Sequence, residues 1–177
     1  MTLAALFLVT HAAIAAQSAD SPGPEEHQLV QRAFGGQLAK AQVLVEKGAA
    51  VDAVGGKKRT ALIWAAANGH TAVVEYLHIK GADINAKDSD SQIAPMLAVR
   101  RSHVPTVEFL LESGAEVNVQ SLERQISALM NSAAVGNETI VRMLLDRGAG
   151  KSLVGLGRHA ALDRAPAIRP SIRSGPA

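Results

Sequence analysis

A Gly-Ala pair returns along this chain at an almost constant interval. The pairs begin at Gly48, Gly81, Gly114 and Gly148, so successive pairs are 33, 33 and 34 residues apart. A fixed period of roughly 20 to 50 residues is typical of proteins built from stacked units, because one such unit cannot bury its apolar face alone. The period therefore predicts an array of repeated units rather than one central core.

Each period contains two segments with helical character. In 61–69, "ALIWAAANG", nearly every side chain is apolar or small, which predicts a short helix buried between its neighbours. In 71–81, "TAVVEYLHIKG", the spacing of Val73, Val74, Leu77 and Ile79 predicts a second helix with one apolar face and its charged residues in water. A helix pair per period follows from these two segments.

The turn position between the two helices reads Gly36, Gly69, Ser102 and Gly136. Glycine adopts positive φ without steric cost, so we expect Ser102 to lose on the order of 1 kcal/mol if it keeps that conformation. Pro95 and Pro105 fall where a helix is expected to begin, and the first turn of a helix tolerates proline. The extra residue of the last interval is expected in the exposed segment 118–127.

The segment "TALIWAAANGHTAVVEYLHIKGADINAKD" at 60–88 resembles the ankyrin repeat nearly position by position. The resemblance covers roughly 25–153. It implies an all-α ankyrin-repeat solenoid of helix-turn-helix units with short β-hairpin or loop fingers, in four repeats at about 25–56, 57–89, 90–122 and 123–153. Leu162 falls one period after Leu129, so we expect 154–177 to hold a partial fifth repeat and a disordered tail.

The first residues differ from the array. Residues 1–16 are mostly apolar and end in the small residues of "AIAAQS", which indicates a signal peptide, and 17–24 form a polar linker. We therefore expect a bacterial exported member of the family, periplasmic or secreted. The location is cytoplasmic if the leader is not cleaved.

Composition restricts the chemistry. The chain has no cysteine, which excludes disulfides and thiolate metal sites, and its aromatic content of 3% argues against stacking platforms for nucleic acid. Residues 150–177 carry a net charge of +4, whereas the whole chain carries +2. The remaining residues therefore carry −2, so their charge does not indicate a nucleic-acid binder.

No catalytic motif stands out in the sequence. We expect no cofactor, metal, small-molecule substrate or enzymatic activity. His70 and His103 occupy the same slot one period apart, which favours a role at the start of a helix over a metal site. Asp88 and Asp90 lack the glycine and terminal glutamate of a calcium loop, so they are expected at a solvated finger tip.

The resemblance implies that a partner contacts the finger tips and the exposed end of each first helix, on the concave face. The matching positions of this chain are Lys57, Lys58, Arg59, Asn68, Asp90, Gln92, Arg100, Arg101 and Arg124. Six of the nine are cations, which fits a protein partner with an acidic surface; ordinary solvated charge is the equally open alternative. Trp64 is expected in the core rather than at the interface.

Together these features predict a non-catalytic protein-binding module acting outside the cytoplasm. The alternatives are an accessory or inhibitory subunit of an envelope enzyme or toxin, and a cytosolic adaptor. An uncapped last repeat would also favour weak self-association through the C-terminal end.

Overall fold

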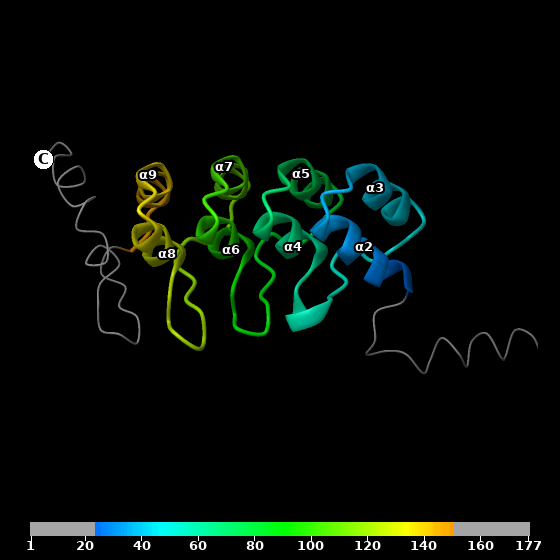
Figure 1. Ribbon diagram of the computed structural model, residues 1–177, viewed down its shortest axis with the longest axis horizontal. Coiled ribbons are helices and arrows are strands. Elements are labelled where there is room, and N and C mark those ends of the chain that lie inside the picture. Colours follow the sequence, from blue (N-terminus) through cyan, green and yellow to red (C-terminus); the bar gives the residue numbers. More distant parts are fainter. Residues whose placement is uncertain (1–23, 151–177) are drawn as a thin grey trace, which may run out of the picture.

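The computed structural model describes residues 24–150, and their helices form four antiparallel pairs stacked side by side (Figure 1). The pairs are α2 (Pro24–Phe34) with α3 (Leu38–Glu46), α4 (Ala61–Ala67) with α5 (Thr71–Ile79), α6 (Ala94–Arg100) with α7 (Val104–Glu112), and α8 (Ala128–Val135) with α9 (Glu138–Asp146). A short 3-10 turn, η1 (Gly56–Lys58), precedes α4. The predicted all-α ankyrin solenoid is confirmed. The expected leader at 1–16, the linker up to residue 23 and the partial fifth repeat at 154–177 lie outside the described residues.

The first helices form the inner row of the stack, in which α4 contacts α2 and α6, and α6 contacts α8. Their composition explains this position. Six of the seven residues of α4 are buried, and four of these are alanines, whose small side chains let neighbouring helices approach closely. The core is therefore a continuous layer that each repeat completes for the next one.

The second helices α3, α5, α7 and α9 form the outer row and bury only one face. In α5, Val73, Val74 and Leu77 are buried, as their spacing predicts. The inclusion of Ile79 in that apolar face was wrong, because its side chain is 78% exposed. Ile79 follows Leu77 by two residues, and residues two apart point to different sides of a helix.

The turn glycines face histidines of the following repeat. Gly36 and Gly69 have φ of 67° and 74°, and a Cβ added at either would lie 2.6 Å from His70 Nδ1 or 2.5 Å from His103 Nδ1, respectively. Ser102 keeps the same conformation, with φ 56°, so the condition for the expected strain is met. The histidine slot of the next repeat holds Asn137, whose side chain instead caps α9 by accepting from Ile140 N. The smaller residue in that slot accounts for a side chain being tolerated at position 102.

The starts of the first helices are fixed in two ways. The side chains of Thr60 and Ser127 accept hydrogen bonds from Ile63 N and Met130 N, so each caps the helix that follows it. The third repeat lacks such a cap at Ile93 and has Pro95 in the first turn of α6 instead. Pro105 occupies the corresponding position in α7, so both prolines lie at helix starts as predicted.

Three loops, 49–60, 82–93 and 115–127, project from the same side of the stack (Figure 1). We call them fingers 2, 3 and 4. Their hairpins reduce to isolated bridges, Val54 with Thr60 and Gln120 with Ser127, rather than strands. The closing backbone bonds span 55–59, 88–92 and 121–126, which places the extra residue inside 118–127 as predicted.

A ladder of side chains joins the base of each finger to the next repeat. Asp52 Oδ1 accepts from Asp83 N at 3.0 Å, Asn85 Oδ1 from Glu116 N at 2.8 Å, and Asn118 Oδ1 from Gly150 N at 2.7 Å. The fingers are thereby held in one row along the finger side. No helix among residues 24–150 is long and apolar enough to cross a membrane.

Candidate partner-binding surface

Fingers 2 to 4 and the first helices enclose two adjoining hollows on the finger side. One, of about 380 Å³, is lined by side chains that include Lys57, Asp90, Arg100 and Arg124, with Met96 and Asn131 from α6 and α8. The other, of about 320 Å³, is lined by Lys57, Arg59, Trp64, Ala67, Leu97, Arg100 and Arg101. Because Lys57, Arg59 and Arg100 line both, the hollows form one surface depression, which we call the groove.

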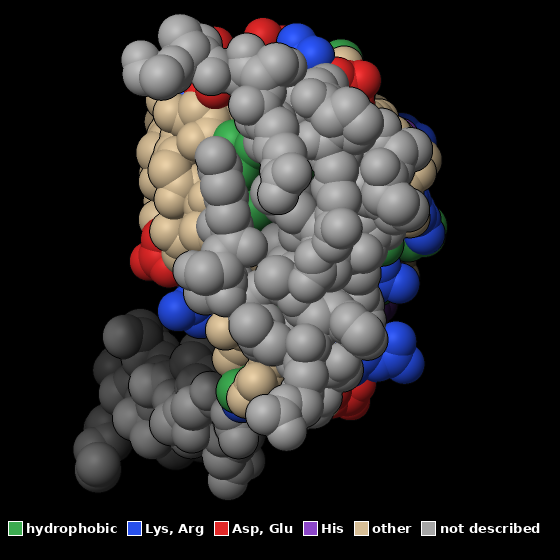
Figure 2. Space-filling model, turned by 90° about the vertical axis from the view of Figure 1, so that its left-hand side faces the viewer, with side chains coloured by type: hydrophobic (Ala, Val, Ile, Leu, Met, Phe, Trp, Pro, Cys, Tyr) green, Lys and Arg blue, Asp and Glu red, His purple; other side chains and the backbone are tan. Residues whose placement is uncertain are grey.

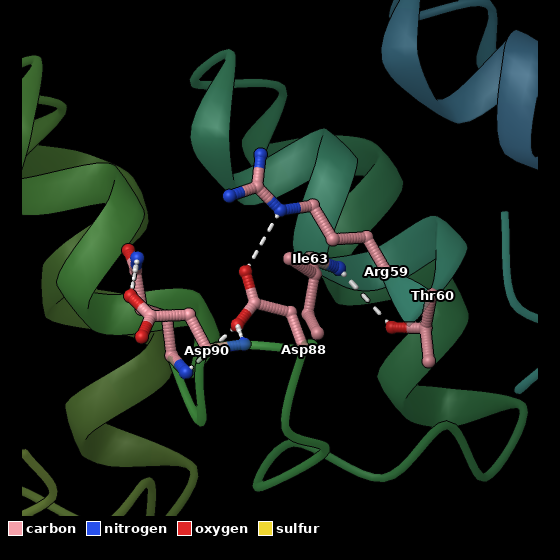
Figure 3. A network of polar contacts seen from close by, with 6 residues as sticks. Arg59, Thr60, Ile63, Asp88 and Asp90 are labelled. Atoms are coloured by element: carbon pink, nitrogen blue, oxygen red, sulfur yellow. Dashed lines mark hydrogen bonds and ion pairs between the residues drawn. The ribbon is translucent and has the colours of Figure 1, made fainter. Parts of the chain in front are cut away.

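Arg59 and Asp88 form an ion pair at the wall of the groove (Figure 3). Arg59 Nε donates to Asp88 Oδ2 at 3.0 Å, and the side chains are 12% and 1% exposed. Asp88 Oδ1 accepts the backbone N–H groups of Asp90 and Gln92, both at 2.9 Å. Asp88 therefore closes finger 3 internally and neutralises Arg59, and it is buried rather than at a solvated tip.

Asp90 connects finger 3 to finger 4. Its Oδ1 accepts from Glu123 N at 2.8 Å, its Oδ2 accepts from Gln92 Nε2 at 2.7 Å, and its carbonyl accepts from Leu122 N at 2.9 Å. Burial raises the pKa of Asp90, but the hydrogen bonds from Glu123 and Gln92 and the charge of Lys57 outweigh it, so the pKa lies below its ordinary value. Of the predicted contact residues, Asp90 and Gln92 thus hold the fingers in register.

Arg101 and Asn68 are partners of each other. Arg101 Nη1 donates to Asn68 Oδ1 at 2.5 Å and to the Ala67 carbonyl at 3.2 Å. These bonds tie the end of α6 to the end of α4, so both predicted contact residues also have a role between repeats.

Four of the nine predicted residues, Lys57, Lys58, Arg100 and Arg124, are exposed and have no side-chain hydrogen bond or ion pair within residues 24–150. Three of them, Lys57, Arg100 and Arg124, meet at the groove, whereas Lys58 does not line it. Figure 2 views the molecule from its α9 end and shows most of the visible Lys and Arg side chains along the right-hand side of that view. Of the nine predicted contact positions, the structure therefore brings only these three together as cations without a hydrogen bond or ion pair among the described residues.

An aromatic pair, of which Trp64 lines the groove and Phe34 lies beside it, was not predicted as part of the site. The rings of Phe34 and Trp64 meet edge to face with centroids 5.4 Å apart, and Phe34 is 52% exposed. The Arg59 guanidinium lies 4.8 Å from the centroid of the Trp64 ring. Trp64 packs against the core and also lines the groove, so the prediction of a purely internal role was incomplete. Phe34 holds the position that Ala67 and Arg100 hold in later repeats, a slot already assigned to partner contact.

His70 and His103 have the predicted local role at the starts of α5 and α7. His70 Nε2 lies 3.0 Å from the Phe34 carbonyl, so it joins neighbouring repeats. Burial lowers the pKa of His103, and the charges of Arg101 and His70 add to that effect. No group of three or more His, Cys, Asp or Glu side chains in the described part of the chain is arranged to hold a metal ion.

The array also matches a known family description. A family of ankyrin repeats, described by a model of three copies, matches residues 27–121 and 79–155. The two matches together extend from within α2 to beyond the end of α9 and cover most of the chain. No curated protein matches the chain.

Proposed function

Because this chain belongs to the ankyrin-repeat family, whose members generally mediate protein–protein interaction, we propose that it is a non-catalytic module that binds a protein partner in the groove. The fingers and first helices form the contact surface. The second helices of the outer row serve to support it.

The unpaired cations of the groove carry this proposal. Residues 24–150 hold 13 Lys and Arg against 14 Asp and Glu, so the described body has a formal charge of −1. Lys57, Arg100 and Arg124 nevertheless gather at one groove without a bonded acidic partner. Unpaired cations on a near-neutral body favour a partner with an acidic surface, and they orient and accelerate its approach more than they raise its affinity.

The bonds between fingers support the same function. Ser89 N donates to the Lys57 carbonyl at 2.9 Å, and Asp90 receives the backbone of finger 4. Fingers 2, 3 and 4 are thus connected in sequence before any partner arrives. A surface ordered in advance loses less conformational entropy on binding, so more of the contact energy appears as affinity.

The proposed location is outside the cytoplasm, in the periplasm or secreted. Its support is the composition of residues 1–16, which resembles a signal peptide. The absence of cysteine is compatible with either redox environment.

A crosslinking pull-down from the host's envelope fraction tests the proposed surface. The bait is compared with a variant in which Lys57, Arg100 and Arg124 are changed to Glu, and with a control in which Lys40, Lys47 and Lys80 of the outer row are changed to Glu. Both variants change the formal charge by the same amount. A protein captured by the parent and the control and lost from the groove variant supports the proposal. Equal capture by all three contradicts it.

A further inference from the structure

The groove has an apolar end and a cationic middle. Trp64 lines the apolar end. Phe34 lies beside the groove, with half of its surface exposed to solvent and its ring in contact with that of Trp64. Trp64 is fixed on another side by Arg59, which is itself held by Asp88. An aromatic side chain held in this way offers apolar area with little entropy left to lose, which is a property of binding hot spots.

The cationic middle adjoins the aromatic pair. Arg100 and Trp64 line the same 320 Å³ hollow, together with Ala67 and Leu97. They belong to successive repeats, whose packed helices lie roughly 8–10 Å apart. An extended peptide in the polyproline II conformation advances about 3.1 Å per residue with about three residues per turn. Two side chains on the same face of such a peptide that reach these two points therefore stand about three positions apart.

The far end of the groove limits how acidic such a peptide can be. Asp90 and Glu123 line the 380 Å³ hollow beside Arg124, so negative charge is already present there. A uniformly acidic segment would meet like charges at this end, and like charges in contact are unfavourable. The charge pattern therefore fits one carboxylate near Arg100 better than a run of them.

From this arrangement we infer that the groove recognises an extended partner segment in which one acidic residue and one large apolar residue lie about three positions apart. The carboxylate pairs with Arg100 and Lys57, and the apolar side chain covers Phe34 and Trp64. This inference rests on the proposed function, because it names the chemistry of the segment that the groove binds.

Selection from a displayed library of random 12-residue peptides on the full chain tests the inference. The inference predicts enriched peptides that carry Asp or Glu two to four positions from a large apolar residue. Enriched peptides without that spacing, or no enrichment over an unrelated bait, would overturn it.

The affinities of enriched peptides give the residue-level test. Trp64 is the only tryptophan of the chain, so its fluorescence reports binding in the groove directly. Arg100→Gln is expected to lower affinity about 10-fold and Phe34→Ser about 5-fold, as for moderate hot-spot residues. The matched controls are Lys40→Gln and Ile79→Ser on the outer row, which should change affinity less than about 2-fold.

The failures of the two proposals differ. Loss of binding in Arg100→Gln with unchanged binding in Phe34→Ser would overturn the aromatic part of this inference and leave the proposed function standing. Circular dichroism of Phe34→Ser, compared with the parent, separates loss of contact from loss of fold. Equal capture of the natural partner by the parent and by the variant with Lys57, Arg100 and Arg124 changed to Glu would contradict the proposed function itself.

Discussion

Arg59 and Asp88 are 29 residues apart in the sequence, yet Arg59 Nε and Asp88 Oδ2 lie 3.0 Å apart, and the Asp88 side chain is only 1% exposed. The pair joins finger 2 to finger 3 at the wall of the groove. Asp88 also accepts two backbone N–H groups of its own finger, so one carboxylate fixes both the shape of finger 3 and its position. The consequences of removing either partner are therefore unequal.

Asp88→Ala is expected to lower the free energy of unfolding by about 3 kcal/mol, because it leaves Arg59 without its buried partner and two backbone donors unsatisfied. Arg59→Leu should cost about half as much, since the Asp88 carboxylate keeps both backbone bonds. Urea denaturation followed by circular dichroism measures both. Equal losses would show that the backbone bonds of Asp88 contribute nothing.

Ser102→Gly is expected to stabilise the protein by up to about 1 kcal/mol, because Ser102 holds φ 56° at a position where three other repeats have glycine. Ser113→Gly is the matched control: Ser113 has φ −80°, so glycine there relieves no strain and only adds freedom to the unfolded chain. Thermal unfolding should separate the two. A lower melting temperature for Ser102→Gly would refute strain at this turn.

Gly69→Ala tests the equivalent turn position of the preceding repeat, which faces His103. The added Cβ would lie 2.5 Å from His103 Nδ1, in addition to the positive φ of 74°. We expect a loss of about 2 kcal/mol or more, larger than the gain from Ser102→Gly. The double variant Gly69→Ala with His103→Asn should recover part of the loss, since Asn137 shows that the slot accepts asparagine. No recovery would mean that the backbone conformation alone causes the loss.

Much of the fold could be predicted because the repeat period aligns the equivalent positions of all four repeats. The positions of Leu77 and of Pro95 in their helices follow from local spacing and helix-start chemistry. Ile79 was placed on the buried face because its apolar character was counted and its direction on the helix was not. The aligned repeats reveal which residue types recur at equivalent positions, whereas the direction of a side chain depends on its angle around the helix axis.

The site was harder to predict, for a physical reason. Arg59, Asp90 and Arg101 look like free surface charges in the sequence, because their partners lie in other repeats or at backbone atoms. A repeat register gives the distance between equivalent positions, but not which charged side chain turns toward its neighbour. Phe34 was missed because the first repeat departs from the alanine or arginine that later repeats hold at its slot.

Acidification should destabilise the native state through His103. Burial holds the pKa of His103 below its ordinary value of 6.5, so between those two values the unfolded chain binds more protons than the native protein. The free energy of unfolding should therefore fall as the pH decreases below 6.5 towards the native pKa of His103. His103→Gln, a residue that the first repeat already has at this slot as Gln37, should flatten that part of the profile. An unchanged slope would exclude His103 as the cause.

Asp90 affects the stability of the protein in a lower pH range than His103. Its pKa lies below the ordinary value of 3.8, so its contribution is complete above that value and is lost as the pH falls through the native pKa. Asp90→Asn should reduce stability at pH 7 and make the loss of stability below pH 3.8 shallower than in the parent. Parallel profiles in that range would contradict the assigned hydrogen bonds.

Export predicts a defined mature chain. Expression of the full sequence in its host should give a protein shortened by 15 or 16 residues, because small residues stand before the cleavage points after Ala15 and Ala16. Intact mass spectrometry of the cell fractions measures this. A full-length mass recovered only from the cytosol would contradict export and favour the cytosolic adaptor.

The most direct test of partner binding in the groove is site-specific photocrosslinking in the host. A photoreactive residue is placed at Glu123, which lines the groove, and separately at Glu75, which is exposed on α5 in the outer row. Crosslinking to one protein from position 123 and not from position 75 is the predicted result. The same protein captured from position 75 alone would place the interface on the second helices and contradict the account.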